Sequence, residues 1–208
     1  MQDTVKGRSV ILVAVALILG IGGLLGYRYW TNRNYEFKGS LIEPALPAYD
    51  FALERADGSV YRLGEQEGKV VLIFFGYTNC PDFCPTTLAE FNRISTELGD
   101  QAEDVEFLFI TVDPERDTPE KVDEYAKAFN PAFIGLSGTP DELAPIYDAY
   151  FVYAQKSDAV TGSGYLVDHS TRTIVIDKFG DFRATFPYGL GVDAVTSDVQ
   201  FLLSETTE

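Results

Sequence analysis

The stretch from residue 70 to residue 88 constrains the fold of this chain more than any other. It opens with an apolar run, residues 70–75, which is typical of a buried strand, and Gly76 ends that run. An amphipathic segment at residues 86–98 predicts a helix. The stretch is therefore predicted to form a strand, a short loop and a helix, and the loop holds the reactive side chains described next.

Both cysteines of the chain, Cys80 and Cys84, lie in this loop, and each is followed by a proline. Positions i and i+4 face one side of a helix, about 5–6 Å apart at Cβ, but proline is tolerated only in a first helical turn. We therefore expect both thiols in a tight loop that leads into the first turn, where a helix N-terminus stabilises thiolate. Such a pair can form a disulfide or bind one soft metal ion. A static structural disulfide, or two ordinary buried thiols, is the simpler alternative.

The charge of the chain limits its partners. Among 208 residues, 32 are acidic and 16 are Lys or Arg, which gives a net charge of −16. Such a surface disfavours nucleic acid and anionic lipid, so we expect no nucleic-acid partner. It would suit a cationic partner, although acidic surfaces usually serve solubility alone. The length allows one membrane segment and one domain with a sizeable core.

The N-terminal segment predicts a transmembrane anchor. Residues 10–26 carry no charge and are rich in Val, Ile, Leu and Ala, which is at the short end of what spans a bilayer. Aromatic residues at positions 27–30 resemble an interfacial belt. A cleaved signal peptide is the alternative, but no Ala-x-Ala site follows the run. The predicted organisation is an N-terminal cytoplasmic tail at 1–9, an anchor at 10–30, a linker at 31–44 and a folded domain at 45–208.

Strands and helices alternate along the predicted domain. A hairpin is expected at residues 51–63, with its turn at Asp57-Gly58. Thr118 as N-cap and Pro119 at the first helical position predict a helix to about residue 129. Further strands are expected at 105–112, 133–136, 150–155, 165–168, 173–177 and 182–186, with the strands at 165–168 and 173–177 paired as a hairpin, and further helices at 141–149 and 192–203. This pattern predicts an α/β fold with a mixed central sheet flanked by helices.

The only histidine, His169, lies at the end of a predicted strand. A lone histidine is usually a solvated surface residue, but here it completes a Cys, Cys, His set. Thiolates select Cu(I) and imidazole accepts either copper oxidation state, while the same set could hold zinc with an open position. Because Met1 is the only methionine, a methionine-type copper site is excluded from the domain. The neighbouring Asp168 could orient the ring, or could be a solvated loop acid.

Three collinear motifs, at residues 76–88, 111–119 and 167–170, together resemble the SCO/SenC family. The resemblance covers roughly residues 45–205. It implies a thioredoxin-like fold behind a membrane anchor, with one copper ion, Cu(I) or Cu(II), bound by Cys80, Cys84 and His169. Family members often carry histidine at the position of Asn79, which is not among the usual ligands. No ligand is expected from the motif at 111–119, whose residues are explained mostly by helix capping.

The resemblance also implies a function and a location. Family members assist assembly of the dinuclear copper centre of cytochrome c oxidase, so the implied partners are oxidase subunit II and a copper donor protein. The implied location is the bacterial cytoplasmic (inner) membrane, crossed once, with the C-terminal domain on the extracytoplasmic side.

Two other functions use the same cysteines. A thiol–disulfide reductase acting on the copper-ligand cysteines of the oxidase subunit would need Cys80 and Cys84 as a redox pair but has no evident use for His169. The usual Cys-x-x-Cys spacing of such enzymes is absent. A peroxidase would need an activating arginine, and Arg93 is the only one close in sequence. Whether the chain is an enzyme is therefore open, and copper delivery is the primary expectation.

Overall fold

The structure is a computed structural model that describes residues 17–23, 26, 35–161 and 164–206. The chain divides into two compact units, residues 1–36 and 37–208. In the first unit, residues 17–23 are helical. The predicted tail at 1–9 and most of the predicted anchor at 10–30 lie outside the described residues. Within the described part of the chain, no helix has both the length and the apolar character needed to cross a membrane.

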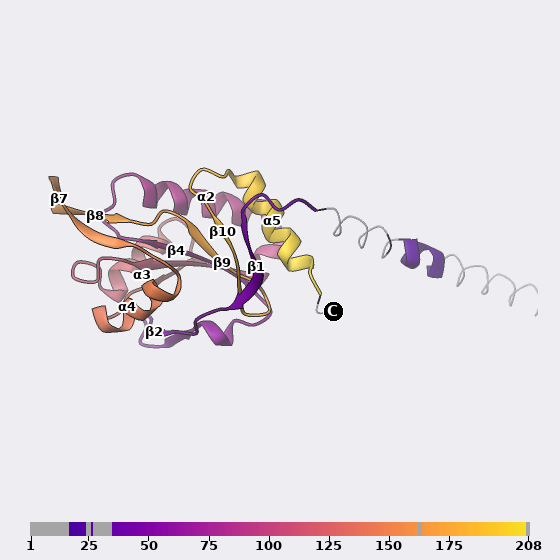
Figure 1. Cartoon of the computed structure of the whole chain (residues 1–208), viewed down its shortest axis with the longest axis horizontal. Helices are drawn as coiled ribbons and strands as arrows, with labels where there is room; N and C mark the ends of the chain where they lie inside the picture. Colours follow the sequence, from indigo (N-terminus) through magenta and orange to yellow (C-terminus); the bar gives the residue numbers. More distant parts are fainter. Residues whose placement is uncertain (1–16, 24–25, 27–34, 162–163, 207–208) are drawn as a thin grey trace, which may run out of the picture. The chain divides into compact units, whose positions relative to one another are not determined.

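The second unit alternates strands and helices (Figure 1). Its strands are β1 (Ser40–Pro47), β2 (Ala52–Glu54), β3 (Val60–Arg62), β4 (Val70–Gly76), β5 (Val105–Thr111), β6 (Ile134–Leu136), β7 (Ala154–Thr161), β8 (Gly164–His169), β9 (Thr173–Ile176) and β10 (Asp181–Phe186). Its α-helices are α2 (Phe83–Leu98), α3 (Pro119–Lys127), α4 (Pro140–Ala149) and α5 (Val192–Ser204), and short 3₁₀ turns occur at Leu63–Glu65 and Gly99–Asp104.

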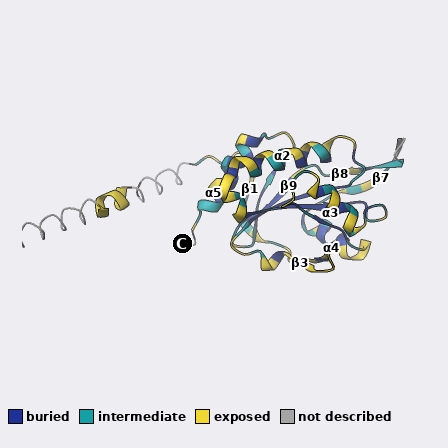
Figure 2. Ribbon diagram, turned by 180° about the vertical axis from the view of Figure 1, so that it is seen from behind, coloured by how far each residue is buried: buried dark blue, intermediate teal, exposed yellow. Residues whose placement is uncertain are grey.

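A six-stranded mixed sheet forms the centre of this unit, in the order β1-β10-β9-β4-β5-β6. Strands β4, β5 and β6 are parallel, and β9, β10 and β1 are each antiparallel to their neighbours. Helices α2 and α5 cover one face and α3 and α4 the other (Figures 1 and 2). The predicted mixed sheet flanked by helices is therefore confirmed, and the hairpin of β2 and β3 is present as a separate pair.

Local sequence explains the elements that flank the site. Every residue of β4 is buried, because β5 and β9 pair with its two edges and helices cover both faces. Helix α2 buries Leu88, Phe91 and Ile94, which recur at intervals of three and form one apolar face. Helix α3 begins as predicted, with the backbone N–H of Lys121 donating to the Thr118 side chain.

Two strand predictions are wrong. Residues 150–153 are not a strand, because Tyr150 is the C-cap of α4 and β7 begins only at Ala154. The expected hairpin between 165–168 and 173–177 also does not form. Strand β8 pairs with β7 in a separate two-stranded sheet, while β9 pairs with β4 and β10. Because both edges of β9 are occupied and all four of its residues are buried, no edge is free for β8.

The expected linker at 31–44 ends earlier than predicted. Strand β1 starts at Ser40 and pairs with β10 along the edge of the sheet. Just before it, the backbone N–H groups of Lys38 and Gly39 donate to the buried carboxylate of Asp198 on α5. The prolines of β1 resemble a loop in sequence, but an edge strand tolerates proline because one side needs no ladder partner.

Candidate metal centre

The two cysteines lie where the central strand β4 gives way to α2. Cys80 is in the intervening loop and Cys84 is the second residue of the helix, as the two prolines predicted. The backbone N–H of Cys84 donates to the Cys80 sulfur over 3.5 Å. Cys84 is 0% exposed and Cys80 is 8% exposed, so only Cys80 has some access to solvent.

Gly76 makes room for the Cys84 sulfur. A Cβ at this position would lie 2.6 Å from Cys84 Sγ and 2.6 Å from a ring carbon of Phe109, closer than side-chain carbons approach such atoms. The sequence marked Gly76 only as the end of the strand. Its role at the site is close packing of backbone against a thiol, which calls for the residue without a side chain.

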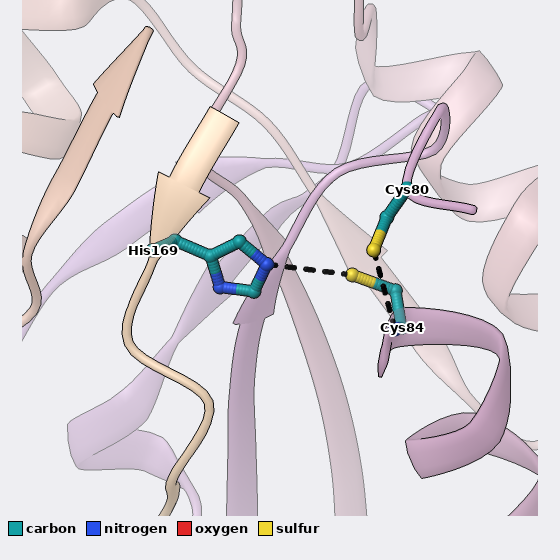
Figure 3. A group of neighbouring side chains, drawn as sticks. All are labelled: Cys80, Cys84 and His169. Carbon is teal, nitrogen blue, oxygen red and sulfur yellow. Dashed lines mark hydrogen bonds between the residues drawn. The ribbon is translucent and has the colours of Figure 1, made fainter. Parts of the chain in front are cut away.

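His169 reaches the thiols from the other sheet. It is the last residue of β8, and its Nε2 lies 3.8 Å from Cys84 Sγ (Figure 3). One ligand atom from each of Cys80, Cys84 and His169 lies within 4.8 Å of the other two. The structure thus brings together all three residues that the sequence singled out, although 85 positions separate Cys84 from His169.

The orientation of the imidazole is set by its backbone. Nδ1 lies 2.8 Å from the carbonyl oxygen of Ser170, and because a carbonyl can only accept, Nδ1 must donate. In the neutral ring Nε2 then carries the lone pair and faces the sulfur. Asp168, considered as the orienting group, is exposed and makes no contact with the ring among the described interactions. Backbone carbonyls are common partners of metal-binding histidines.

Aromatic rings surround the imidazole. Tyr77 meets it edge-on with ring centroids 5.7 Å apart, and Phe74 does so at 6.1 Å. Both come from β4 or the residue directly after it, so the strand that leads to the cysteines also contacts the histidine. The sequence offered no signal for these contacts.

Asp117 holds the cysteine loop in place. Its buried carboxylate accepts from the backbone N–H of Thr78 at 2.9 Å and from the Thr78 hydroxyl at 2.5 Å. It also accepts from the Thr111 hydroxyl at 2.8 Å and pairs with Lys121 at 3.1 Å. The motif at 111–119, explained above by helix capping, therefore also ties the loop to β5 and α3.

A second set of contacts attaches the hairpin that carries His169. The Tyr165 hydroxyl donates to Asp113 over 2.6 Å, and Arg116 forms an ion pair with the same carboxylate. The Arg116 guanidinium stacks over the Tyr165 ring, 3.6 Å from its centroid. Together these residues join β8 to the loop that follows β5.

The two thiols differ in acidity. A hydrogen bond from the Cys84 side chain lowers the pKa of Cys80 to about 3; burial opposes this, while the amide groups of Asp82 and Cys84 favour the thiolate. The pKa of Cys84 is raised, because its thiol donates to Cys80 and is buried. Cys80 is therefore the thiolate of the metal-free pair, and Cys84 holds the proton.

A cleft of about 350 Å³ opens onto Cys80 and His169. Two sulfurs and one imidazole nitrogen at this spacing form a soft donor set that fits copper and could also take zinc. The same two sulfurs could instead form a disulfide. Arg93, the arginine that a peroxidase would need, is exposed on α2 and does not line the cleft.

A mixed α/β sheet with two cysteines and a histidine gathered at the end of its central strand defines a class of proteins that bind soft metal ions or exchange disulfides. Within that class, the SCO1/SenC family model matches residues 41–204. The chain belongs to the SCO1/SenC family.

Individual relatives agree with this placement. The chain is 33% identical to an SCO2-like protein of Rickettsia prowazekii over 180 residues, which covers 85% of this chain and 88% of that protein. The structure of apo Sco1 from Thermus thermophilus is similar with a TM-score of 0.73 and 41% identity, covering 81% of this chain and 98% of that one. The structure of ScoI from Bradyrhizobium japonicum with copper bound has a TM-score of 0.67 and 37% identity, covering 74% and 97%.

Proposed function

We propose that this protein is a membrane-anchored copper chaperone that helps to assemble the dinuclear copper centre of cytochrome c oxidase. Its folded domain would be thioredoxin-like, and copper would be its cargo. The observation that carries the proposal is the convergence of Cys80, Cys84 and His169, whose ligand atoms lie within 4.8 Å of one another. Family membership supports the oxidase role, and the Bradyrhizobium relative with copper bound supports the choice of metal.

The donor chemistry favours copper on physical grounds. In this proposal, the Cys80 and Cys84 sulfurs and the His169 Nε2 hold the ion. Two thiolates suit Cu(I), and the imidazole adds the harder nitrogen that Cu(II) prefers. The lowered pKa of Cys80 supplies one thiolate without the need to expel a proton, and the Ser170 carbonyl keeps Nε2 available.

A thiol–disulfide reductase remains the second candidate, because one observation favours it. Cys80 is the partly accessible thiol with the lowered pKa, and Cys84 is buried beside it with a raised pKa. An attacking thiolate with a neighbouring thiol to resolve the mixed disulfide is the arrangement such chemistry needs. This function would leave His169 without a role.

Substituting the histidine separates the two candidates. In His169→Ala, Cu(II) binding by the full-length protein should fall far more than Cu(I) binding, since two thiolates alone can still hold Cu(I). Disulfide exchange by Cys80 and Cys84 should change little, and oxidase activity in a complemented deletion strain should fail when copper is limiting. Ser170→Ala is the matched control, because it keeps the backbone carbonyl that Nδ1 contacts. If His169→Ala binds both ions normally and restores the oxidase, the reductase should replace the chaperone.

The proposed location is a single pass through the bacterial inner membrane, with the copper domain outside the cytoplasm and with oxidase subunit II and a copper donor as partners. A reporter that is active only outside the cytoplasm should be active when it is fused after Glu208. Activity of a cytoplasmic reporter at the same position would reverse the orientation.

A further inference from the structure

His169 forms a wall shared by two clefts. The first, here called the thiol-side cleft, has a volume of about 350 Å³ and includes Cys80, Pro81, Asp82, Phe83, Asp168 and His169 in its lining. The second, the arginine-side cleft, has a volume of about 440 Å³ and includes Ser40, His169, Ser170, Arg172, Thr185 and Tyr188. A chain that crosses over the imidazole would therefore contact both.

The two clefts carry opposite charge. Apart from the metal-binding side chains themselves, the charged groups of the thiol-side cleft are the exposed carboxylates Asp82 and Asp168, and no Lys or Arg occurs among its described lining residues. In the arginine-side cleft Arg172 is the charged side chain. It is exposed, and within residues 35–161 and 164–206 it forms no ion pair, although the chain has 32 acidic residues. An uncompensated cation is thus presented beside the candidate metal ligands.

An aromatic pair joins the rims of the clefts. Phe83 lines the thiol-side cleft and Tyr188 lines the arginine-side cleft, and their rings meet edge-on with centroids 5.0 Å apart. They are 42% and 40% exposed. Partly exposed aromatic side chains of this kind are typical anchors of protein interfaces, because they bury much apolar area on contact.

We infer that the two clefts and the Phe83–Tyr188 pair form one docking surface for an extended segment of a copper-exchanging partner protein. The segment places a cysteine in the thiol-side cleft and a carboxylate against Arg172. The charges fix its direction, because Asp82 and Asp168 repel the carboxylate that Arg172 attracts. The inference rests on the proposed function only in that the partner exchanges copper; docking itself can be measured without metal.

Short peptides test the docking on the reduced, metal-free, full-length protein. The probe peptide carries one cysteine and, three residues away, one glutamate on a Gly/Ser background; the comparison peptide has glutamine in place of glutamate. The glutamate peptide should bind about fivefold more tightly, the size expected for one exposed charge pair. Arg172→Gln should abolish the difference, and Arg172→Glu should make a lysine peptide the preferred one. Arg93→Gln, the same charge change on an exposed arginine of α2, should leave it intact.

Copper transfer supplies the second measurement. The probe is the soluble copper domain of oxidase subunit II from the same organism, and copper affinity is measured in parallel by chelator competition. Phe83→Ala and Arg172→Glu should slow transfer at least about fivefold, with unchanged copper affinity, as expected when rim contacts steer association. Phe179→Ala is the control, because Phe179 is 39% exposed and lines a different cleft.

Failure of the docking surface and failure of the proposed function give different results. Equal binding of the two peptides to the wild-type protein would overturn the docking surface. So would an Arg93→Gln variant that loses the preference for the glutamate peptide as fully as Arg172→Gln does. Wild-type protein that binds copper but never delivers it to the oxidase domain would contradict the proposed function instead, and the peptide result would still decide the docking.

Discussion

The thiol half and the histidine half of the candidate centre are built differently. Cys80 and Cys84 follow β4, whose seven residues are all buried at the centre of the six-stranded sheet. His169 ends β8, which belongs to a separate two-stranded sheet and buries only Val167. Figure 3 shows the imidazole approaching the sulfurs from that second strand. The candidate ligand atoms lie a few ångströms apart, yet the thiols are held by a fully buried strand and the imidazole by a mostly unburied one.

This difference predicts which half of the candidate metal centre opens first by local unfolding. Regions with few buried apolar contacts open locally at lower free energy than a core strand. The hairpin is attached through Tyr165, Asp113 and Arg116, and through an exposed ion pair between Lys156 and Glu115. We therefore expect the imidazole to leave the sulfurs by hairpin opening, while the thiols keep their geometry until the whole domain unfolds.

The largest expected effect is a difference in reactivity between the two thiols. Cys80, with a pKa of about 3, loses its thiolate only as the pH falls through that value. At pH 6 its thiolate fraction should be about a thousandfold that of a thiol of pKa 9, since each pH unit below the pKa removes tenfold of the thiolate. The gain in rate with iodoacetamide should be smaller, because a thiolate of low pKa is intrinsically less nucleophilic. Mass spectrometry should show labelling of Cys80 that stays flat from about pH 5 to 8, with Cys84 unlabelled. A tenfold rise in rate per pH unit across that range would contradict the assignment.

Disturbing the thiol half should affect the whole domain. Gly76→Ala places a methyl group against Cys84 Sγ and the Phe109 ring, and such overpacking costs about 1–3 kcal/mol in the free energy of unfolding. Denaturant unfolding measures that cost, and copper titration should show weakened binding. In the background of Cys84→Ala the penalty should shrink, because one of the two clashing atoms is gone. Equal penalties in the two backgrounds would mean that the ring of Phe109 carries the whole effect.

Disturbing the histidine half should stay local. Tyr165→Phe removes the hydroxyl that donates to Asp113 and should cost about 0.5–1.5 kcal/mol, the net value of one hydrogen bond. Amide hydrogen exchange should quicken in β7 and β8 and remain unchanged in β4. Faster exchange in β4 as well would show that the two halves open together.

The smallest effect is expected from Lys156→Ala. The ion pair with Glu115 joins side chains that are 52% and 62% exposed, and pairs of this kind contribute about 0–1 kcal/mol. Exchange in the hairpin should change less than in Tyr165→Phe. A larger change than in Tyr165→Phe would mean that the exposed ion pair, and not the partly buried contacts of Tyr165, holds the hairpin in place.

Sequence reasoning succeeded where the signal is local. The apolar run of β4, the Thr118 cap with Pro119 behind it, and the cysteines running into the first turn of α2 all follow from short-range patterns. It failed for contacts between distant segments. The carboxylate of Asp117 reaches back to Thr78, 39 positions away, and nothing in the motif around it indicates that partner. The Ser170 carbonyl orients the ring because of backbone direction at the end of β8, which periodicity does not predict.

The prediction that β8 pairs with β9 was wrong for a related reason. Two apolar runs separated by a few residues are typical of a hairpin. Here β4 and β10 occupy both edges of β9, so β8 pairs with β7 instead. The placement of His169 beside the cysteines was reached through resemblance to a family rather than through any property of the intervening residues.

Residues 37–39, here called the N-terminal clasp, determine where the chain can be cut to give a soluble domain. Phe37 stacks on Phe186 and meets Phe201 edge-on, and the next two backbone N–H groups donate to Asp198. A soluble version cut at residue 45, the boundary that the sequence suggested, would lose these contacts and most of β1, which spans Ser40–Pro47. The edge of β10 would then be open to other chains, which invites aggregation during expression. A cut before Phe37 keeps the clasp, so preparation of this domain for crystals or assays should begin there.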